Sequence, residues 1–434
     1  MKTGGGPAAT GQPFRTRTPN LVKTETYDVI VAGGGSAGVA AAFASAKAGA
    51  RTLLVEKFNC LGGASTMRGV STYCGLYTLG DQPRQVVGGV ADMVLTGLKQ
   101  RGALSDIQRH RGVFVVFDPE SVKSVLDDLC VQAGVTVMLG AMVVAANRQD
   151  GQITAVTIAD HSGLHEIAAT AFVDCTGDGD LLALGGADTR YGNDGQVNLG
   201  TLAARFGGIP FGVKVAAQDL ADAVGRHDKD GVNTTKDKSV LVRLPISNDV
   251  VCYVASADYD PRDAHSMSAA ERDGRQQVWH YLAALKTIPG CEHAYLVSTG
   301  PEFGTRESRH IQAKRTFTWR DVIEGTQFDD CIAFGAWGAE WHDRQDYSSS
   351  FDLPPRGDAY QIPMSCLISR NTSRLYAAGR LADGDRLGGA AIRVMGTAFA
   401  TGQACGVAAA LSVSDVVPSI ADIQKTLRLQ NAIL

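Results

Sequence analysis

The sequence lacks any long apolar run, because glycine, threonine or a charged residue interrupts each apolar stretch before it reaches about 18 residues. A helix that spans a bilayer needs about 20 such residues, so we expect no membrane span. Residues 1–26 also lack the apolar centre of a signal peptide. They are rich in glycine, threonine and proline, which predicts a flexible arm over residues 1–23. Because no signal peptide is recognised, we expect a cytoplasmic protein.

Clustered metal ligands and basic patches are lacking as well. The nine cysteines are spread thinly, with no Cys-x-x-Cys pair and no zinc-like cluster, which predicts reduced thiols and no metal site. The formal net charge is −4 and the basic residues are scattered. This pattern excludes nucleic acid as an expected partner.

Proline is sparse, with 14 residues, whereas glycine is abundant, with 50 of 434. Linkers and collagen-like repeats are rich in both, so glycine is expected here at tight turns and close backbone contacts. The length suits two or three domains, and the 44% share of hydrophobic residues suits ordinary globular cores.

A strand, a glycine turn, a helix and a second strand follow one another near the N-terminus. Residues 27–32 and 51–56 are short apolar runs typical of buried strands, and residues 36–48 form a run of small side chains that predicts a closely packed helix. The whole segment has the length of one βαβ unit, about 30 residues.

The glycine turn has the spacing Gly-x-Gly-x-x-Gly at Gly33, Gly35 and Gly38. Such glycines permit a tight turn, approach of a pyrophosphate to the backbone, and close helix packing, while the helix N-terminus favours negative charge. Glu56 ends the second strand, where an acid accepts hydrogen bonds from a ribose 2′-hydroxyl. This favours FAD or NAD over NADP; the alternative is a plain turn between packed elements.

The rest of the chain predicts a return to the same sheet. A helix is expected from Pro119, capped by Asp118 and ended by Gly134. Further helices are expected over 269–285 and 391–411 and a buried strand over 374–379. Four short strands are expected as a β-meander, over 135–139, 141–148, 152–159 and 164–174.

Five separated segments carry a family resemblance: VAGGGSAGVAAA with VEK, LGGAST at 61–66, VDCTGDGDL at 173–181, GTRESRHI at 304–311 and AAGRLADGDRLGGAAIRVMGTAFATGQACG at 377–406. With these motifs in this order, residues 27–410 resemble the FAD-dependent oxidoreductase family with a glutathione-reductase-like, two-lobe Rossmann FAD fold, distantly akin to fumarate reductase flavoproteins. The resemblance implies FAD as the cofactor.

The resemblance also implies the cofactor contacts. The turn from Asp174 would lie beside the adenosine and pyrophosphate, although a plain turn capped by Asp180 is the alternative. Either Asp383 or Asp385 would approach the ribityl chain, and a helix starting at Ala391 would point its N-terminus at the flavin ring. The expected FAD-binding residues are Gly33, Gly35, Ser36, Ala37, Gly38, Glu56, Lys57, Gly63, Ala64, Asp174, Thr176, Gly177, Asp178, Gly379, Arg380, Asp383, Asp385 and Ala391.

Two features of related enzymes are missing. Disulfide reductases carry a Cys-x4-Cys pair just after the glycines that correspond to Gly62 and Gly63, but no cysteine follows them here before Cys74. No second Gly-x-Gly-x-x-Gly follows a strand either, so we expect no thiol–disulfide chemistry and no NAD(P)H domain. Electrons are then expected to pass to or from O2, another diffusible acceptor or a partner protein.

The candidate catalytic residues are His342, Arg306, Arg309, His310 and Arg393. Arginine forks suit a carboxylate, and a histidine beside a flavin can move a proton while hydride goes to N5. His342 is the first choice, because Glu340, Trp341 and Asp343 flank it. The alternatives are an interdomain ion network for the arginines and a structural role for each histidine.

The sequence therefore predicts an α/β protein with a Rossmann-type FAD-binding lobe, containing a parallel sheet and a β-meander, and an inserted α+β substrate lobe. The FAD lobe is expected over 24–187 and 365–434, and the substrate lobe over 188–364. The expected function is a dehydrogenase or oxidase that transfers hydride between flavin N5 and a small polar metabolite, carboxylated or ring-containing. A flavin monooxygenase using O2 and NAD(P)H and a non-catalytic nucleotide-binding protein are the alternatives, and a homo-oligomer is left open.

Overall fold

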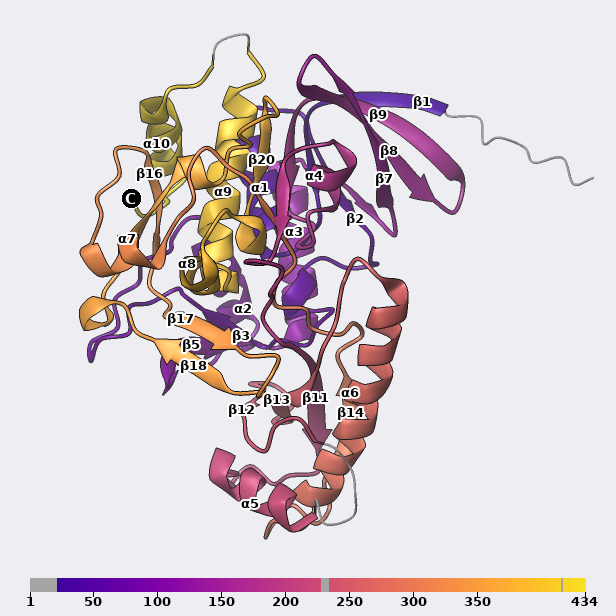
Figure 1. Cartoon of the computed structure of the whole chain (residues 1–434), viewed down its shortest axis with the longest axis vertical. Helices are drawn as coiled ribbons and strands as arrows, with labels where there is room; N and C mark the ends of the chain where they lie inside the picture. The colour runs from indigo at the N-terminus through magenta and orange to yellow at the C-terminus, as the bar shows by residue number, and fades with distance from the viewer. Residues whose placement is uncertain (1–21, 228–233, 415–416) are drawn as a thin grey trace, which may run out of the picture.

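The computed structural model describes residues 22–227, 234–414 and 417–434. The predicted arm over 1–23 lies outside these residues, except for its last two positions, which belong to the first strand. The chain forms an α/β fold around a seven-stranded sheet (Figure 1).

The centre of this sheet is parallel. Its order is β6-β2-β1-β9, and β20 pairs in parallel with the C-terminal half of β9. β7 and β8 continue the sheet beyond β9 as an antiparallel meander, as predicted. The first of the four strands expected in this meander is the exception, because β6 pairs in parallel with β2. The bounds are β1 (Val22–Ala32), β2 (Thr52–Glu56), β6 (Thr136–Leu139), β7 (Met142–Gln149), β8 (Gln152–Asp160), β9 (Gly163–Asp174) and β20 (Leu375–Ala377).

Both faces of the parallel strands are covered. Val29 and Val31 of β1 lie in the core cluster formed with the helices, whereas Ile30 and Ala32 lie in the cluster formed with the meander. Side chains of a strand alternate between its faces, so a strand buried on both faces must be apolar throughout. This explains why the last part of β1, residues 29–32, is a continuous apolar run.

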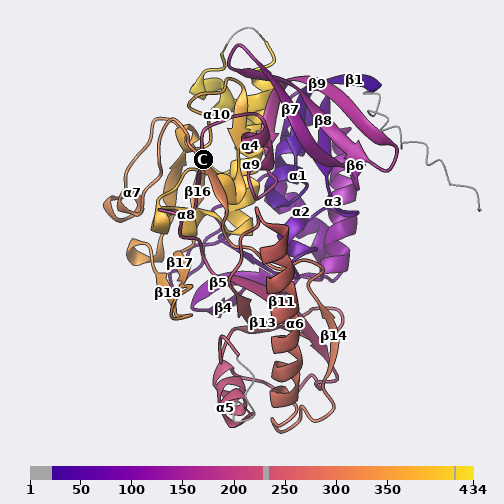
Figure 2. The same cartoon turned by 45° about the vertical axis from the view of Figure 1, so that its right-hand side comes forward.

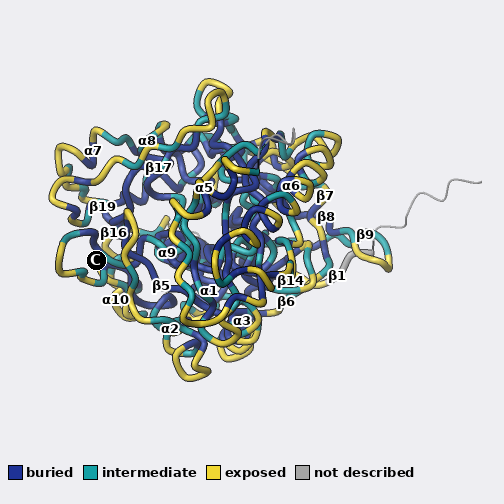
Figure 3. The backbone as a smooth tube through the Cα atoms, turned by 90° about the horizontal axis from the view of Figure 1, so that it is seen from below, coloured by how far each residue is buried: buried dark blue, intermediate teal, exposed yellow. Residues whose placement is uncertain are grey.

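Helices cover the first of these faces, and buried backbone gathers in the interior of the molecule (Figure 3). The N-terminal helix has the predicted position, and the next long helix has its expected caps, since the Asp118 carboxylate accepts from the Ser121 amide and Gly134 is left-handed. The bounds are α1 (Ser36–Lys47), α2 (Val90–Gln100), α3 (Pro119–Ala133), α9 (Met395–Leu411) and α10 (Ile420–Leu429).

The predicted single helix over 391–411 is wrong at its start. Ala391 belongs to the short helix α8 (Arg386–Ile392), and α9 begins only at Met395, bent by 89° from α8. No single helix in the described ranges is long and apolar enough to cross a membrane, and this bent pair alone meets the test of length and composition.

A second body extends from the first, below it in Figure 1 and again in the turned view of Figure 2. Its antiparallel sheet, β12-β13-β11-β14, packs against α6, and α5 packs against α6, around a core of their own. The predicted helix over 269–285 is part of the longer α6. The bounds are β11 (Gly200–Gly207), α5 (Ala217–His227), β12 (Leu241–Arg243), β13 (Val250–Ala257), α6 (Ala264–Leu285) and β14 (Tyr295–Thr299).

The remaining elements are short, and several of them pack on the first body, where β16 contacts α9 and α4 contacts β7. Segments between residues 317 and 362 contribute to the core cluster that contains α1 and α9. The domain boundaries expected at 187/188 and 364/365 stay a prediction. The bounds are β3 (Thr72–Cys74), β4 (Gln108–His110), β5 (Gly112–Val116), α4 (Asp180–Leu184), β10 (Thr189–Tyr191), β15 (Arg309–Ile311), α7 (Trp319–Glu324), β16 (Cys331–Gly335), β17 (Ala339–His342), β18 (Ser349–Asp352) and β19 (Tyr360–Pro363).

Candidate active site

Two of the three glycines of the turn after β1 are fixed by close backbone contacts. Gly33 has a φ of +94°, and a Cβ there would overlap the carbonyl oxygen of Cys175 at the end of β9. A Cβ at Gly38 would overlap the carbonyl oxygen of Gly33. The turn therefore tolerates no side chain at these two positions, and α1 starts directly against the sheet.

Gly35 differs, because it faces open space. A Cβ there would meet only the Cα atom of Gly63, 3.8 Å away, in the loop that includes Ala64. The Ser36 hydroxyl is buried without a hydrogen-bond partner in the described structure, and no side chain there caps α1. Free amides, a free hydroxyl and room above a helix N-terminus fit a pyrophosphate.

Glu56 is buried at the end of β2, 5% exposed. Its carboxylate accepts hydrogen bonds from the amides of Gly34 at 2.6 Å and Phe58 at 2.9 Å. Burial raises the pKa of this carboxyl group. A carboxylate has about four acceptor positions, so Glu56 retains capacity for a ribose hydroxyl.

The turn after β9 is held by its own side chains. The Asp174 carboxylate accepts from the Thr176 amide at 2.9 Å, the Thr176 hydroxyl at 2.7 Å and the Leu182 amide at 2.8 Å. Burial raises the pKa of Asp174 to about 6. α4 begins after Gly179, so Asp174 and Thr176 satisfy its first amides and Asp180 is not the cap.

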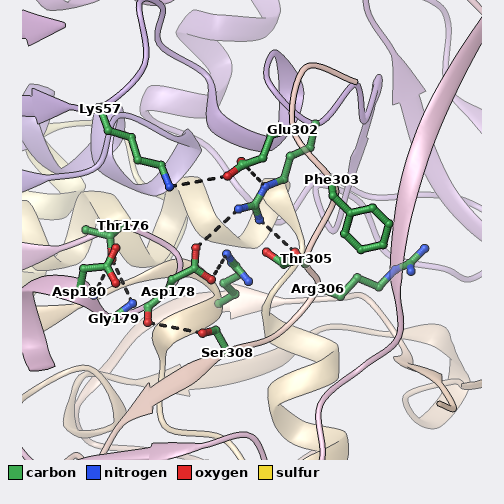
Figure 4. Close-up of polar contacts among 12 residues, drawn as sticks. Lys57, Thr176, Asp178, Gly179, Asp180, Glu302, Phe303, Thr305, Arg306 and Ser308 are labelled. Atoms are coloured by element: carbon green, nitrogen blue, oxygen red, sulfur yellow. Dashed lines mark hydrogen bonds and ion pairs between the residues drawn. The ribbon is translucent and has the colours of Figure 1, made fainter. Parts of the chain in front are cut away.

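Beside this turn runs a series of ion pairs, here called the ion chain: Lys57, Glu302, Arg68, Asp178 and Arg380. Figure 4 labels Lys57, Glu302 and Asp178 of this chain. The successive N to O distances are 3.6, 2.9, 3.6 and 2.8 Å. Three cations face two anions, and the Nη1 atom of Arg380 is buried without a partner in the described ranges. This unused donor fits an anionic group of the cofactor.

Arg380 also links the ion chain to the glycine turn. Its side chain covers Gly177, where a Cβ would lie 2.9 Å from Nε, and a Cβ at Gly379 would lie 3.3 Å from the Cβ of Ala37. The structure thus brings the predicted residues at 33–38, 56–57, 63–64, 174–178 and 379–380 together at the carboxyl ends of β1, β2, β9 and β20. Arg68 and Glu302, which join them, were not predicted.

The other three predicted cofactor residues have partners within the chain. Asp383 accepts from the Ala313 amide at 2.9 Å and pairs with Arg190 at 3.1 Å. Asp385 caps α8, accepting from the Gly388 amide at 2.6 Å. Ala391 is buried inside α8, and the free N-terminus belongs instead to α9, where the buried Thr397 hydroxyl has no partner in the described chain.

Three predicted catalytic residues meet around Glu340; we call Arg306, Glu340, His342 and Arg393 the His342 cluster. The His342 Nε2 atom lies 3.4 Å from Oε1 of Glu340, and Nη2 of Arg393 lies 3.8 Å from Oε2. Arg306 donates to the Leu199 carbonyl at 2.5 Å and to the Thr201 hydroxyl at 2.6 Å. In Figure 4 the side chain of Arg306 points away from the ion chain.

The electrostatics of the His342 cluster follow from burial and from its excess of cations. Burial, together with the positive charge of Arg306, lowers the pKa of His342 to about 3, so the imidazole is neutral at physiological pH. Burial and the charge of Arg393 lower the pKa of Arg306 to about 10. Despite its burial, Glu340 has a pKa held below its usual value by His342 and the two arginines.

Lys236 lies beside the His342 cluster. It was not predicted, because no motif surrounds it in the sequence. Its Nζ atom lies 3.1 Å from Nδ1 of His342. Burial lowers the pKa of Lys236 to about 8, with a further contribution from Arg306.

Arg309 and His310, in contrast, lie outside the cluster with partners of their own. Arg309 donates to the Asp178 carbonyl at 2.9 Å. The two ring nitrogens of His310 lie 2.9 Å from the Ala382 carbonyl and 2.9 Å from the Glu307 carboxylate. These two contacts favour the alternative in which His310 has a structural rather than a catalytic role.

Solved structures with a similar fold include a geranylgeranyl bacteriochlorophyll reductase-like protein from Thermoplasma acidophilum, at 13% identity, covering 93% of this chain and 83% of that one with a TM-score of 0.45. A p-nitrophenol 4-monooxygenase from Pseudomonas putida has 13% identity, 93% and 84% coverage and a TM-score of 0.46. An anhydrotetracycline hydroxylase from Streptomyces rimosus has 15% identity, 92% and 64% coverage and a TM-score of 0.46.

A search of curated proteins finds no match to the chain. The family model described as FAD dependent oxidoreductase, however, matches residues 28–433. This range includes the glycine turn, the ion chain and the His342 cluster. The chain therefore belongs to the FAD dependent oxidoreductase family, and it is an enzyme with FAD as its cofactor.

Proposed function

We propose that this enzyme oxidises a small metabolite with a carboxylate group, which Arg306 and Arg393 bind while His342 accepts a proton. The observation that carries the proposal is the excess of cations in the His342 cluster. Two guanidinium groups and Lys236 surround Glu340, the one carboxylate paired with the cluster's arginines among the described residues.

The arginines retain donors for a ligand. A guanidinium has five N–H groups, and Arg306 uses only its Nη1 atom in the contacts to Leu199 and Thr201. The Nε atom of Arg393 is buried with no partner in the described part of the chain. Guanidinium forks match carboxylate geometry, and a buried donor without a partner is costly until a ligand satisfies it.

FAD, when bound, supplies the hydride acceptor and carries the difficult electronic step. The chain's own residues would bind and orient the substrate through Arg306 and Arg393 and exclude water around it. His342 is neutral, because its pKa is about 3, so it has a lone pair with which to take the proton of a substrate O–H or N–H group.

The test is an anaerobic screen of small carboxylates, each paired with its amide, that follows loss of the flavin's visible absorbance. We expect reduction by a carboxylate but not by its amide, without any nicotinamide. Reduction by NADH alone would instead support the monooxygenase alternative and contradict the proposal. Arg393→Met should weaken the response, whereas Arg386→Met, at a half-exposed arginine stacked on Trp341, is the matched control.

A further inference from the structure

Two consecutive residues, Asn198 and Leu199, are hydrogen-bonded to both His342 and Arg306. They bind both polar groups of the His342 backbone, whose amide donates to the side-chain oxygen Oδ1 of Asn198 at 2.9 Å and whose carbonyl accepts from the Leu199 amide at 2.9 Å. On the other side, the Leu199 carbonyl accepts from Nη1 of Arg306 at 2.5 Å. One dipeptide therefore holds two residues that come from separate segments of the chain.

The side-chain amide of Asn198 has one orientation that satisfies its surroundings. Its Nδ2 atom donates to Oε2 of Glu307 at 3.0 Å, and the backbone amide of Asn198 donates to the same oxygen at 2.9 Å. The opposite orientation would place the NH2 group against the amide of His342 and the oxygen against a carboxylate. Asn198 is 1% exposed and Glu307 is 3% exposed. Glu307 thus determines that the oxygen of Asn198 faces His342.

Glu307 is itself held at its backbone and at its carboxylate. Its amide and that of Arg306 donate to the buried Tyr259 hydroxyl, at 3.0 and 3.1 Å. Its Oε1 atom lies 2.9 Å from Nε2 of His310, whose other ring nitrogen lies 2.9 Å from the Ala382 carbonyl. The carboxylate is therefore a fixed support for the side-chain amide that it contacts.

We propose that Asn198 is a positioning residue, which holds His342 where proton transfer from a substrate bound at Arg306 requires it. A base takes a proton only within hydrogen-bond reach, about 2.6–3.2 Å between heavy atoms. A displacement of about 1 Å slows such a step by about 100-fold. The inference rests on the proposed function, in which Arg306 binds the carboxylate and His342 accepts the proton.

Loss of the Asn198 side chain should affect its two partners differently. Arg306 keeps its contacts to the Leu199 carbonyl and the Thr201 hydroxyl. The His342 amide, in contrast, loses its acceptor. Proton transfer should therefore slow while binding of the carboxylate persists, a separation that a residue serving only the packing of the core would not produce.

The test is stopped-flow, anaerobic reduction of the FAD-loaded protein by the 2-hydroxy or 2-amino carboxylate that reduces wild type fastest, at varied concentration. We expect Asn198→Ala to lower the limiting rate constant by about 10- to 100-fold and to change the half-saturating concentration by less than about 3-fold. Asn193→Ala is the matched control, because Asn193 donates to the other oxygen of the Glu307 carboxylate, at 3.2 Å. It should be reduced at the wild-type rate.

Asn198→Asp combined with Glu307→Gln exchanges the amide and the carboxylate across their contact. An oxygen still faces the His342 amide, so the double variant should recover a limiting rate within about 3-fold of wild type. Circular dichroism and the flavin spectrum establish folding and loading, and the double variant decides the matter if Asn198→Ala does not fold.

A folded Asn198→Ala protein with the wild-type limiting rate would overturn the inference, as would equal changes in rate and half-saturation. A double variant that is slow or unfolded would also overturn it. Failure of the proposed function has a different result: no carboxylate would reduce the wild-type flavin, or His342→Asn would be reduced as fast as wild type. That result removes the positioning role as well.

Discussion

Gly402 of α9 lies directly against Ala37 of α1, so closely that a Cβ at Gly402 would overlap the carbonyl oxygen of Ala37. The contact repeats one turn later, where Gly406 lies against Ala41. The two helices therefore touch through their backbones. Since α1 starts at the glycine turn, this contact also fixes the helix N-terminus that we expect to face the FAD.

Gly402→Ala should destabilise the protein. The added methyl group has no space in the packed interface, and such overpacking lowers the free energy of unfolding by about 1–3 kcal/mol. Gly225→Ala is the control, because Gly225 is an exposed position inside α5 where a Cβ meets nothing. That change should raise the free energy of unfolding by about 0.5 kcal/mol. Urea denaturation measures both, and equal effects would contradict the packing explanation.

The glycine turn after β1 could be predicted from the sequence because its residues follow one another closely. Strand, turn and helix signals of the βαβ unit are local, and Gly33, Gly35 and Gly38 have fixed positions within it. The break between α8 and α9 was missed, since its residues resemble a continuous helix and Tyr360, which donates to the Ala391 carbonyl, is distant in sequence.

The sites formed by distant side chains could be predicted only in part. His342, Arg306 and Arg393 were named from their residue types, but their meeting around Glu340 depends on the fold. Lys236 has no motif, and its contact with His342 spans two separate segments of the chain. No local sequence pattern predicts a contact between residues so far apart in the chain.

Gly35→Val should give a folded protein that binds little FAD. Its backbone has a φ of −71°, which valine can adopt, and the nearest atom to a Cβ is 3.8 Å away, so the fold tolerates the change. The side chain would fill the space expected for the pyrophosphate. The ratio of absorbance at the flavin band to that of the protein, with circular dichroism, measures both properties.

Gly38→Val is the comparison for this prediction. A Cβ at Gly38 overlaps the Gly33 carbonyl, so this variant should lose the fold as well as the flavin. Full flavin content in Gly35→Val would show that the pyrophosphate does not lie over this turn.

Arg68→Met should be strongly destabilising. Arg68 is 9% exposed and lies between Glu302 and Asp178, so its loss leaves buried carboxylates with less compensation. Breaking a buried pair costs about 3–5 kcal/mol, and Glu302→Gln in the same chain should recover part of it. Arg84→Met removes an exposed pair with Asp358 and should cost at most about 1 kcal/mol. Comparable losses in the two variants would contradict this difference.

His342 should make the protein less stable in mild acid. Its pKa is lowered from 6.5 to about 3 in the folded protein, so below pH 6.5 the unfolded chain binds a proton that the folded chain does not. Stability from this group is complete above pH 6.5 and falls with pH towards 3, by about 1.4 kcal/mol at pH 5.5. Urea midpoints at pH 7.5 and 5.5 should therefore differ less in His342→Gln than in wild type. His265→Gln, at an exposed histidine in the first turn of α6, should retain the wild-type difference. An unchanged pH dependence in His342→Gln would mean that the imidazole is protonated in the folded state.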